Sequence, residues 1–162
     1  MKVLIKPAGK KGKGVFAARD IKKGEIIHKV DYKGLKIVKK EDISKLSEKD
    51  QNHIDYIGEG KYVVGYSAIF LVNHCCEPNC YIRYNKMLNK DLVAIKNIKK
   101  GEEIGVDYVI DTTGKWKMKC YCGSKNCRKI INSDYFKLPK DLQKKYLKFV
   151  PKWKKKNLTK NN

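Results

Sequence analysis

The chain has 162 residues and a hydrophobic content of 41%, which suits one domain with a core of its own, and we expect no second independent domain. Its 38 basic and 17 acidic residues give a formal net charge of +21, which predicts attraction to polyanions or to proteins bound to them. No apolar run is long enough for a transmembrane helix, and the first residues are too short a hydrophobic stretch for a signal peptide. We therefore expect an intracellular, cytoplasmic protein that could associate with a nucleoid or with chromatin.

Short strands separated by glycine turns are predicted for the first part of the chain. The strand signals are apolar runs at residues 3–5, 15–18 and 26–32. Gly12 and Gly14 lie between the first two runs, where two glycines let the backbone approach a ligand closely. This spacing alone is a weak signal, since it is more often a hairpin turn.

Residues 41 to 57 change to a helical period. Ser47 to Asp50 has the spacing of a capping box, and apolar residues at positions 43, 46, 54 and 57 fall near one helical face. We predict one or two short helices there, as an insert over about residues 41–58. His53 lies in this insert and is expected to be a surface or packing histidine.

Strand signals return with the apolar runs at 62–66, 68–72, 81–84, 92–95 and 104–108. The turn Lys99 to Glu103 repeats the Lys-Lys-Gly-Glu turn at Lys22 to Glu25. So many short strands around one helical insert predict a mainly β fold of small sheets with short helices.

The cysteines indicate a metal site. Cys120, Cys122 and Cys127 lie within eight residues, with a glycine that allows a tight turn. A tetrahedral zinc needs a fourth ligand, and the other thiols all lie in one stretch, at Cys75, Cys76 and Cys80. A zinc site would therefore join the C-terminal loop to that stretch, and free thiols in a reducing compartment are the alternative.

An amphipathic helix is predicted near the C-terminus. Leu138, Leu142, Tyr146 and Phe149 have helical spacing and follow the position where Pro139 favours a helix start. The tail from Lys152 to Asn162 is rich in lysine and has no acidic residue, and its simplest interpretation is a solvated, disordered end.

Five motifs in one order resemble the SET-domain protein lysine methyltransferases. They are residues 12–17, 31–34, 73–79 and 101–108, followed by the cysteine motif of a post-SET segment at 120–128. The resemblance implies a SET fold of small curved β-sheets around a knot-like centre, in which residues 73–79 thread under the loop before Tyr108. It also implies a SET domain over 1–110, a post-SET zinc segment over 111–131, and a C-terminal helix with a basic tail over 132–162.

The resemblance also implies the ligands. S-adenosylmethionine would be held by the backbone of the first glycine motif, at Gly12, Lys13, Gly14 and Val15, together with Asn73 and His74. Tyr121 or Trp116 could cover the adenine ring. One zinc ion would be bound by Cys76, Cys120, Cys122 and Cys127.

The implied reaction is methyl transfer to the side-chain amine of a protein lysine. Tyr108 and Tyr32 would be the catalytic hydroxyls that line the lysine channel. Val106 stands where the family usually has Phe or Tyr, so the larger space predicts di- or trimethylation unless Tyr66 or Tyr84 fills it.

Some positions depart from the family pattern. No pre-SET cluster is expected, Cys75 adds a competing thiol, and Phe70 replaces a common arginine near the cofactor. The residues after the knuckle resemble short prokaryotic or viral members. We expect a monomer whose substrate is a histone-like, ribosomal or other nucleic-acid-associated protein, with nucleic acid as a further partner of the basic surface. The alternative function is a basic zinc protein that binds nucleic acid or chromatin without catalysis.

Overall fold

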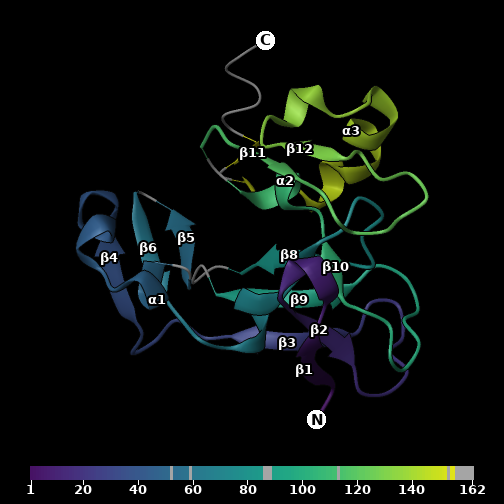
Figure 1. Ribbon diagram of the computed structural model, residues 1–162, viewed down its shortest axis with the longest axis horizontal. Helices are drawn as coiled ribbons and strands as arrows, with labels where there is room; N and C mark the ends of the chain where they lie inside the picture. The colour runs from purple at the N-terminus through teal and green to yellow at the C-terminus, as the bar shows by residue number, and fades with distance from the viewer. Residues whose placement is uncertain (52, 59, 86–88, 113, 153, 156–162) are drawn as a thin grey trace.

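The computed structural model describes residues 1–51, 53–58, 60–85, 89–112, 114–152 and 154–155. Across these residues the strands are short and form small sheets, joined by turns and brief helices (Figure 1). The predicted fold class, mainly β with short helices, is confirmed. None of the described helices combines the length and the apolar character that crossing a bilayer requires.

Two three-stranded antiparallel sheets make up the body of the molecule. The first has the order β3 (Ile26–Val30), β9 (Lys90–Ala94) and β8 (Cys80–Tyr84). The second has the order β4 (Lys36–Lys39), β6 (Lys61–Val64) and β5 (Ile54–Gly58). The other described strands pair as β1 (Val3–Pro7) with β2 (Lys13–Ala17), β7 (Asn73–His74) with β10 (Gly105–Val106), and β11 (Lys117–Lys119) with β12 (Ile130–Asn132).

The helices are short, and several are 3-10 turns between strands. The 3-10 turns are η1 (Gly9–Lys11), η2 (Lys40–Lys45), η3 (Ala68–Leu71), η4 (Tyr135–Lys137) and η5 (Leu147–Phe149). The α-helices are α1 (Glu48–Gln51), α2 (Tyr108–Asp111) and α3 (Lys140–Tyr146). The C-terminal helix predicted behind Pro139 is therefore confirmed as α3 followed by η5.

The helical prediction for residues 41–58 is only partly right. The segment forms η2 and α1, and the Ser47 hydroxyl accepts a hydrogen bond from the Asp50 N–H at 3.1 Å, as a capping residue does. The rest of it is strand β5, which pairs with β6 along the edge of the second sheet. Pairing with a neighbouring strand has overridden the helical spacing of the apolar residues.

Two predicted strands also differ. Residues 68–72 form η3 instead of a buried strand, because the N–H groups of Phe70 and Val72 bond locally, to Ser67 O at 3.1 Å and Ile69 O at 3.3 Å. The strand predicted over 104–108 is limited to Gly105–Val106. Asp107 then caps α2, accepting a hydrogen bond from the Val109 N–H at 3.2 Å, so the following tyrosine begins a helix.

The centre of the fold is the short parallel pairing of β7 with β10, in which Gly105 lies opposite Asn73 and Val106 opposite His74. The Asn79 side chain holds this pairing: its Oδ1 accepts from the Gly105 N–H at 2.9 Å and its Nδ2 donates to a backbone carbonyl of the same segment at 2.8 Å. A Cβ atom on Gly105 would lie 2.6 Å from Cys75 Cβ, so only glycine permits this approach. The segment 73–79 thus lies against the segment before Tyr108, as the resemblance implied.

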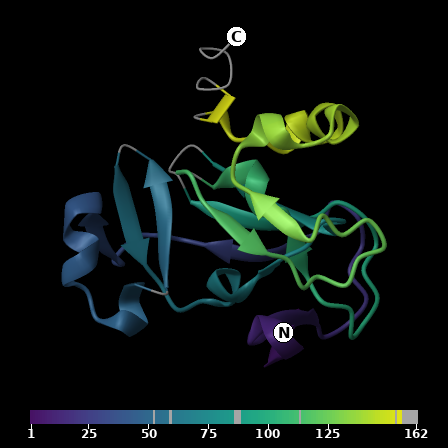
Figure 2. The ribbon, with the colours of Figure 1, turned by 45° about the horizontal axis from the view of Figure 1, so that its top comes forward.

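The C-terminal third packs onto α2, and Figure 2 shows its helices, in yellow and green, above the green strands β11 and β12. The shared apolar cluster includes Val109 and Ile110 from α2 and Ile131, Tyr135 and Tyr146 from the C-terminal third.

The start of the basic tail is docked on the protein. The ammonium of Lys154, which is 8% exposed, donates to Val109 O at 2.6 Å and to Thr112 O at 2.9 Å, at the end of α2. The prediction of a solvated end is therefore wrong for this residue, since its charge is used to complete the hydrogen bonds of helix carbonyls. Residues 153 and 156–162 of the predicted tail lie outside the described residues.

Candidate active site and zinc centre

A cavity of about 240 Å³ lies between η1, β7 and the segment that leads into the cysteine knuckle. Its lining combines the basic residues Lys10, Lys11 and Lys119 with Tyr121, whose ring is exposed. The Lys10 ammonium lies 5.6 Å from the centroid of the Tyr121 ring. Such a lining suits a ligand that carries both a carboxylate and a flat aromatic ring.

The back of this cavity is built around Asn73, whose Nδ2 donates to Lys13 O at 3.0 Å and to Glu103 Oε1 at 2.9 Å. Glu103 is also paired with the Lys11 ammonium. A Cβ atom on Gly14 would lie 2.8 Å from Asn73 Nδ2 and 2.7 Å from Glu103 Oε1, so this cluster needs a glycine at position 14. The first glycine motif and the Asn73 stretch are thereby brought together at one site.

A second cavity, of about 300 Å³, lies on the side of β5 and η3. Its apolar wall includes Ile69, Phe70, Ile82 and Val106, and Trp116 lies at its edge with the C-terminal segment. An apolar wall of this kind suits the methylene chain of a long side chain. Among the described lining residues, neither of the two tyrosines considered as space fillers, at positions 66 and 84, is present.

Tyr108 lines both cavities and so lies between them. Its hydroxyl donates a hydrogen bond to Val72 O at 2.8 Å. Burial, together with the nearby negative charge of Asp111, raises the pKa of Tyr108 to about 12. The phenol therefore stays protonated at neutral pH and acts as a hydrogen-bond donor, not as a base.

Charged groups also face the second cavity, and two tyrosine hydroxyls lie behind them. Lys90, which is 4% exposed, pairs its ammonium with Asp55 Oδ1 at 2.6 Å, and the Tyr32 hydroxyl donates to Asp55 Oδ2 at 2.8 Å. The Tyr84 hydroxyl donates to Asp111 Oδ2 at 3.2 Å, and burial raises the pKa of Asp111. Asp55 has a full counter-charge in Lys90, whereas Asp111 is held by a neutral hydroxyl.

Four thiols gather where the knuckle meets the segment after β7. The ligand atoms of Cys76, Cys120, Cys122 and Cys127 all lie within 4.8 Å of one another. Zinc–sulfur bonds of about 2.3 Å in a tetrahedron put the sulfurs about 3.8 Å apart, and the Sγ atoms of Cys76 and Cys120 are 3.7 Å apart. The donor set and its spacing therefore fit a structural zinc ion. Cys75 is not part of the group, and its thiol contacts Ser124 Oγ at 3.3 Å.

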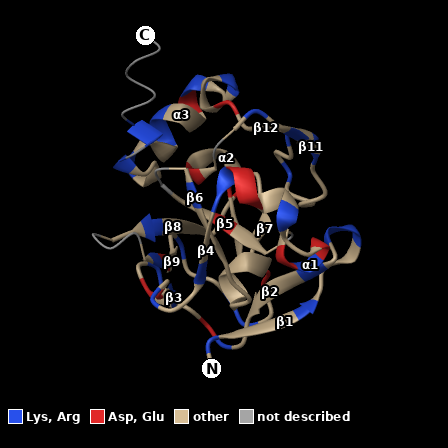
Figure 3. Cartoon of the chain, turned by 90° about the vertical axis from the view of Figure 1, so that its left-hand side faces the viewer, with Lys and Arg blue, Asp and Glu red and all other residues tan. Residues whose placement is uncertain are grey.

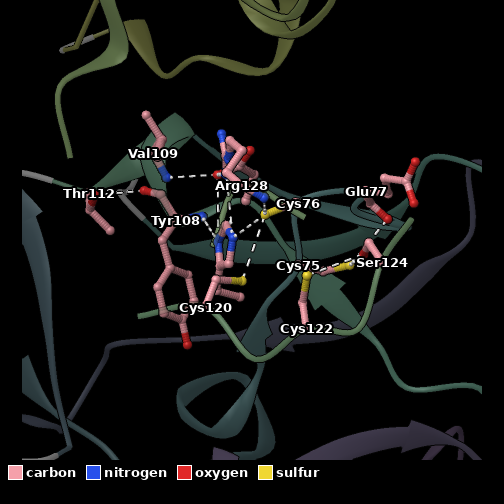
Figure 4. A network of polar contacts seen from close by, with 12 residues as sticks. Cys75, Cys76, Glu77, Tyr108, Val109, Thr112, Cys120, Cys122, Ser124 and Arg128 are labelled. Atoms are coloured by element: carbon pink, nitrogen blue, oxygen red, sulfur yellow. Dashed lines mark hydrogen bonds and ion pairs between the residues drawn. The ribbon is translucent and has the colours of Figure 1, made fainter. Parts of the chain in front are cut away.

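Buried polar contacts connect this thiol group to the start of α2 (Figure 4). The Arg128 N–H donates to Cys76 Sγ at 3.3 Å, and the Arg128 guanidinium pairs with Asp107 Oδ1 at 2.8 Å. The imidazole of His74 lies between them, with Nε2 3.4 Å from Cys76 Sγ and Nδ1 3.2 Å from the Tyr108 N–H. Burial and the positive charge of Arg128 lower the pKa of His74 to about 3, so the ring is neutral.

The sequence that forms much of these two cavities matches a known family. A family model described as the SET domain matches residues 12–109, more than half of the chain. The chain belongs to the SET domain family.

Curated relatives agree with this assignment. The chain is 34% identical over 137 residues to the histone-lysine N-methyltransferase trithorax of Drosophila melanogaster. This similarity covers 75% of this chain and 3% of that protein. It is 35% identical over 130 residues to an H3 lysine-36 specific histone-lysine N-methyltransferase of Saccharomyces cerevisiae, covering 72% of this chain and 17% of the relative. The chain thus spans only a small part of the relatives' length.

A solved structure is also similar. It is a crystal structure of a Plasmodium falciparum protein provisionally assigned as a histone methyltransferase, with a TM-score of 0.53 and 27% sequence identity. The similarity covers 66% of this chain and 92% of that one. SET domain methyltransferases use S-adenosylmethionine, and the lining of the first cavity fits that cofactor: lysines suit its carboxylate, and an aromatic ring suits its adenine.

The structure brings several predicted site residues of this SET domain together. Asn73 and Tyr121 line the first cavity, Val106 lines the second, and Tyr108 lines both. Trp116, the other candidate for covering an adenine, lies at the second cavity, so the two candidates occupy different places.

Other predicted residues lie next to the two cavities, and not all of them line one. Tyr32 lies behind Asp55 and does not itself line the second cavity. The stretch Gly12–Val15 lies behind the first cavity, which η1 lines instead, and the Val15 side chain is fully buried in the core. The imidazole of His74 is turned toward the thiol group, although the residue contributes to the cavity lining.

The sequence did not indicate the ion pairs of Lys90 with Asp55 and of Arg128 with Asp107. The first joins strands that are 35 residues apart, and nothing in the local pattern marks either residue. The second had a signal, since Arg128 follows the last knuckle cysteine and Asp107 precedes the predicted catalytic tyrosine.

We expect protein purified without chelator to contain one zinc ion per chain. Cys120→Ser should lose the metal and lower the melting temperature, because structural zinc contributes directly to folding free energy. Cys75→Ser is the matched control and should keep one zinc, since its thiol lies outside the group. Elemental analysis checks both variants, and a metal-free wild type would contradict the four-thiolate site.

Proposed function

We propose that this SET domain transfers methyl groups from S-adenosylmethionine to the side-chain amine of a lysine in a protein. One observation carries the proposal: a partly buried tyrosine, Tyr108, lies between a cavity suited to the cofactor and a cavity suited to a lysine side chain. A protein that only binds nucleic acid would need no such arrangement, so the non-catalytic alternative is not favoured. The methyl-transfer unit would span residues 1–110, with 111–131 as the zinc segment and 132–162 as its C-terminal cover.

The cofactor would lie in the first cavity, with its carboxylate near the ammonium groups of Lys10 and Lys11 and its adenine near Tyr121. When bound, the cofactor supplies an electrophilic methyl group on a sulfonium. Asn73 is fixed by Lys13 O and Glu103, so its amide would be held ready for the ligand without further loss of side-chain entropy. The backbone at Gly14 leaves room for this arrangement.

The substrate lysine would enter the second cavity along its apolar wall. An ammonium has a pKa of about 10.4 and cannot attack a methyl group until it loses its proton, which desolvation in the cavity favours. The protonated Tyr108 hydroxyl, fixed on Val72 O, would position the amine, and Tyr32 would act from behind through Asp55. The main contribution to rate would be alignment of the reacting atoms.

The substrate would be a histone-like or other nucleic-acid-associated protein, since the curated relatives are named histone-lysine methyltransferases. The distribution of charge supports such a partner. Residues 114–162 contain 16 Lys or Arg and two acidic residues, so most of the net charge lies in this third of the chain. We also propose that the protein acts as an intracellular monomer.

A basic and aromatic surface lies next to the second cavity. A hollow of about 770 Å³ is lined by the exposed Lys115, Lys117 and Lys137 together with Trp116 and Phe136, and Trp116 also lines the lysine cavity. In Figure 3, Lys and Arg are frequent along β11 and α3. Lysines attract a phosphate backbone and aromatic rings can stack on bases, so nucleic acid bound here would present an attached protein to the active site.

Tyr108→Phe should fold but lose most of its turnover, by about a hundredfold or more, because the amine loses the group that positions it. A labelled-methyl assay on a histone mixture measures this. Tyr66→Phe is the matched control, since the Tyr66 hydroxyl is bonded to Asp50 at the exposed helical insert and should not affect turnover. Full activity of Tyr108→Phe would contradict the proposed role.

Val106→Phe should change the product. Valine leaves space in the lysine cavity for two or three methyl groups, whereas a phenyl ring would fill part of it and stop the reaction at monomethyl lysine. Mass spectrometry of a peptide product after exhaustive reaction checks this. If the wild type makes only monomethyl lysine, the assignment of Val106 to product control is wrong.

Association with nucleic acid should weaken steeply with salt. Replacing Lys115, Lys117 and Lys137 by Gln should reduce the slope of log K against log salt by about 3 for a duplex. The matched control replaces Lys22, Lys23 and Lys100, which are exposed and outside this surface, and removes the same charge. Equal effects of both triple variants, measured by fluorescence anisotropy with labelled DNA, would show that only the overall charge matters.

A further inference from the structure

The backbone contact of His74 favours one tautomer of its ring. Nδ1 lies 3.2 Å from the Tyr108 N–H, and a backbone N–H can only donate, so Nδ1 must accept and carries no hydrogen. A neutral imidazole then has its hydrogen on Nε2. Two groups lie beside Nε2. Cys76 Sγ, at 3.4 Å, can accept its hydrogen, whereas Arg128 Nη2, at 3.3 Å, is a donor that is bonded to Asp107 Oδ1 at 2.8 Å.

We propose that His74 is a positioning residue that connects the zinc-bound Cys76 thiolate to the backbone of Tyr108. One ring makes both contacts: Nε2–H donates to the thiolate, and Nδ1 accepts from the Tyr108 N–H. The resemblance implied that this histidine helps to hold the cofactor, and the residue lines the first cavity, while its side chain is only 3% exposed and contacts Cys76.

The contact acts on Tyr108 because the bonded amide lies at the start of α2. The phenol of the same residue reaches Val72 O, directly before β7, so the backbone and the hydroxyl are both tied to the segment that carries His74. A shift of Cys76 would move the ring, and the ring would move the amide and the hydroxyl. Misplacement of a positioning group by about 1 Å can reduce a rate by about a hundredfold.

The surrounding contacts also connect the thiol group to the start of α2. The Arg128 N–H also donates to Cys76 Sγ, at 3.3 Å, and its guanidinium holds Asp107, whose carboxylate caps α2. Both routes from the thiol group therefore end at the first residues of the same helix. Partners that orient a metal ligand in this way usually matter for the function of the metal site.

The kinetic test compares His74→Phe and His74→Asn with the matched control His53→Asn, which removes an imidazole far from the thiols. We expect His74→Phe to keep one zinc per chain and lose about tenfold or more in kcat, with KM for the cofactor within about threefold. His74→Asn keeps an acceptor near the Nδ1 position and should recover part of kcat. A raised KM with unchanged kcat, or loss of zinc in step with activity, would overturn the proposal.

A second measurement needs neither a variant nor turnover, so it separates this proposal from the proposed methyl transfer, on which the kinetic test rests. Protein labelled with ¹⁵N-tyrosine gives one amide resonance for each of its ten tyrosines. Exchanging zinc for cadmium lengthens the metal–sulfur bonds and should shift the Tyr108 resonance well beyond that of Tyr66. An unmoved Tyr108 resonance would overturn the coupling even if the enzyme methylates lysine.

Discussion

The parallel pairing of β7 with β10 is the constraint on which the rest of the site depends. It is only two residues long, yet it contains Asn73, His74 and Val106, and Cys76 and Tyr108 each lie two residues beyond it. Such a short pairing has little stability of its own, and the Asn79 side chain adds two hydrogen bonds that fix the crossing from inside. The two cavities and the thiol group are therefore positioned by one crossing, not by separate elements.

The sequence predicted the members of the site better than their arrangement. Motifs record which residue types are present, so Asn73, Tyr108 and the thiols were found from their neighbours along the chain. The secondary structure around them was less accessible: Ile54–Gly58 is a strand because β6 lies beside it, and residues 68–71 are a 3-10 turn whose N–H groups bond to nearby carbonyls. The strand depends on a partner that no local window contains, and an apolar run does not show whether it will extend or close into a turn.

Side-chain direction was the least predictable property. The resemblance assigned His74 to the cofactor and gave Trp116 as one of two candidates for the adenine. His74 does line the first cavity, with its imidazole Nε2 3.4 Å from Cys76 Sγ, and Trp116 lines the second cavity. Two neighbouring residues of a strand point to opposite faces, so Asn73 can face the cavity while His74 faces the thiol group. The same motif thus serves two sites, which its order in the sequence does not reveal.

The buried pair of Arg128 and Asp107 fixes an orientation but adds little to the stability of the fold. Among the described residues, Asp107 Oδ2 and the Nε and Nη1 atoms of Arg128 are buried without a hydrogen-bond partner. Unpaired buried polar atoms each cost about 1–3 kcal/mol, so the pair contributes little net stability compared with apolar residues of the same volume. Its effect is directional instead: a guanidinium that must meet one carboxylate allows the cysteine knuckle only one orientation on α2. A fixed orientation at this place is what a residue positioned between two cavities requires.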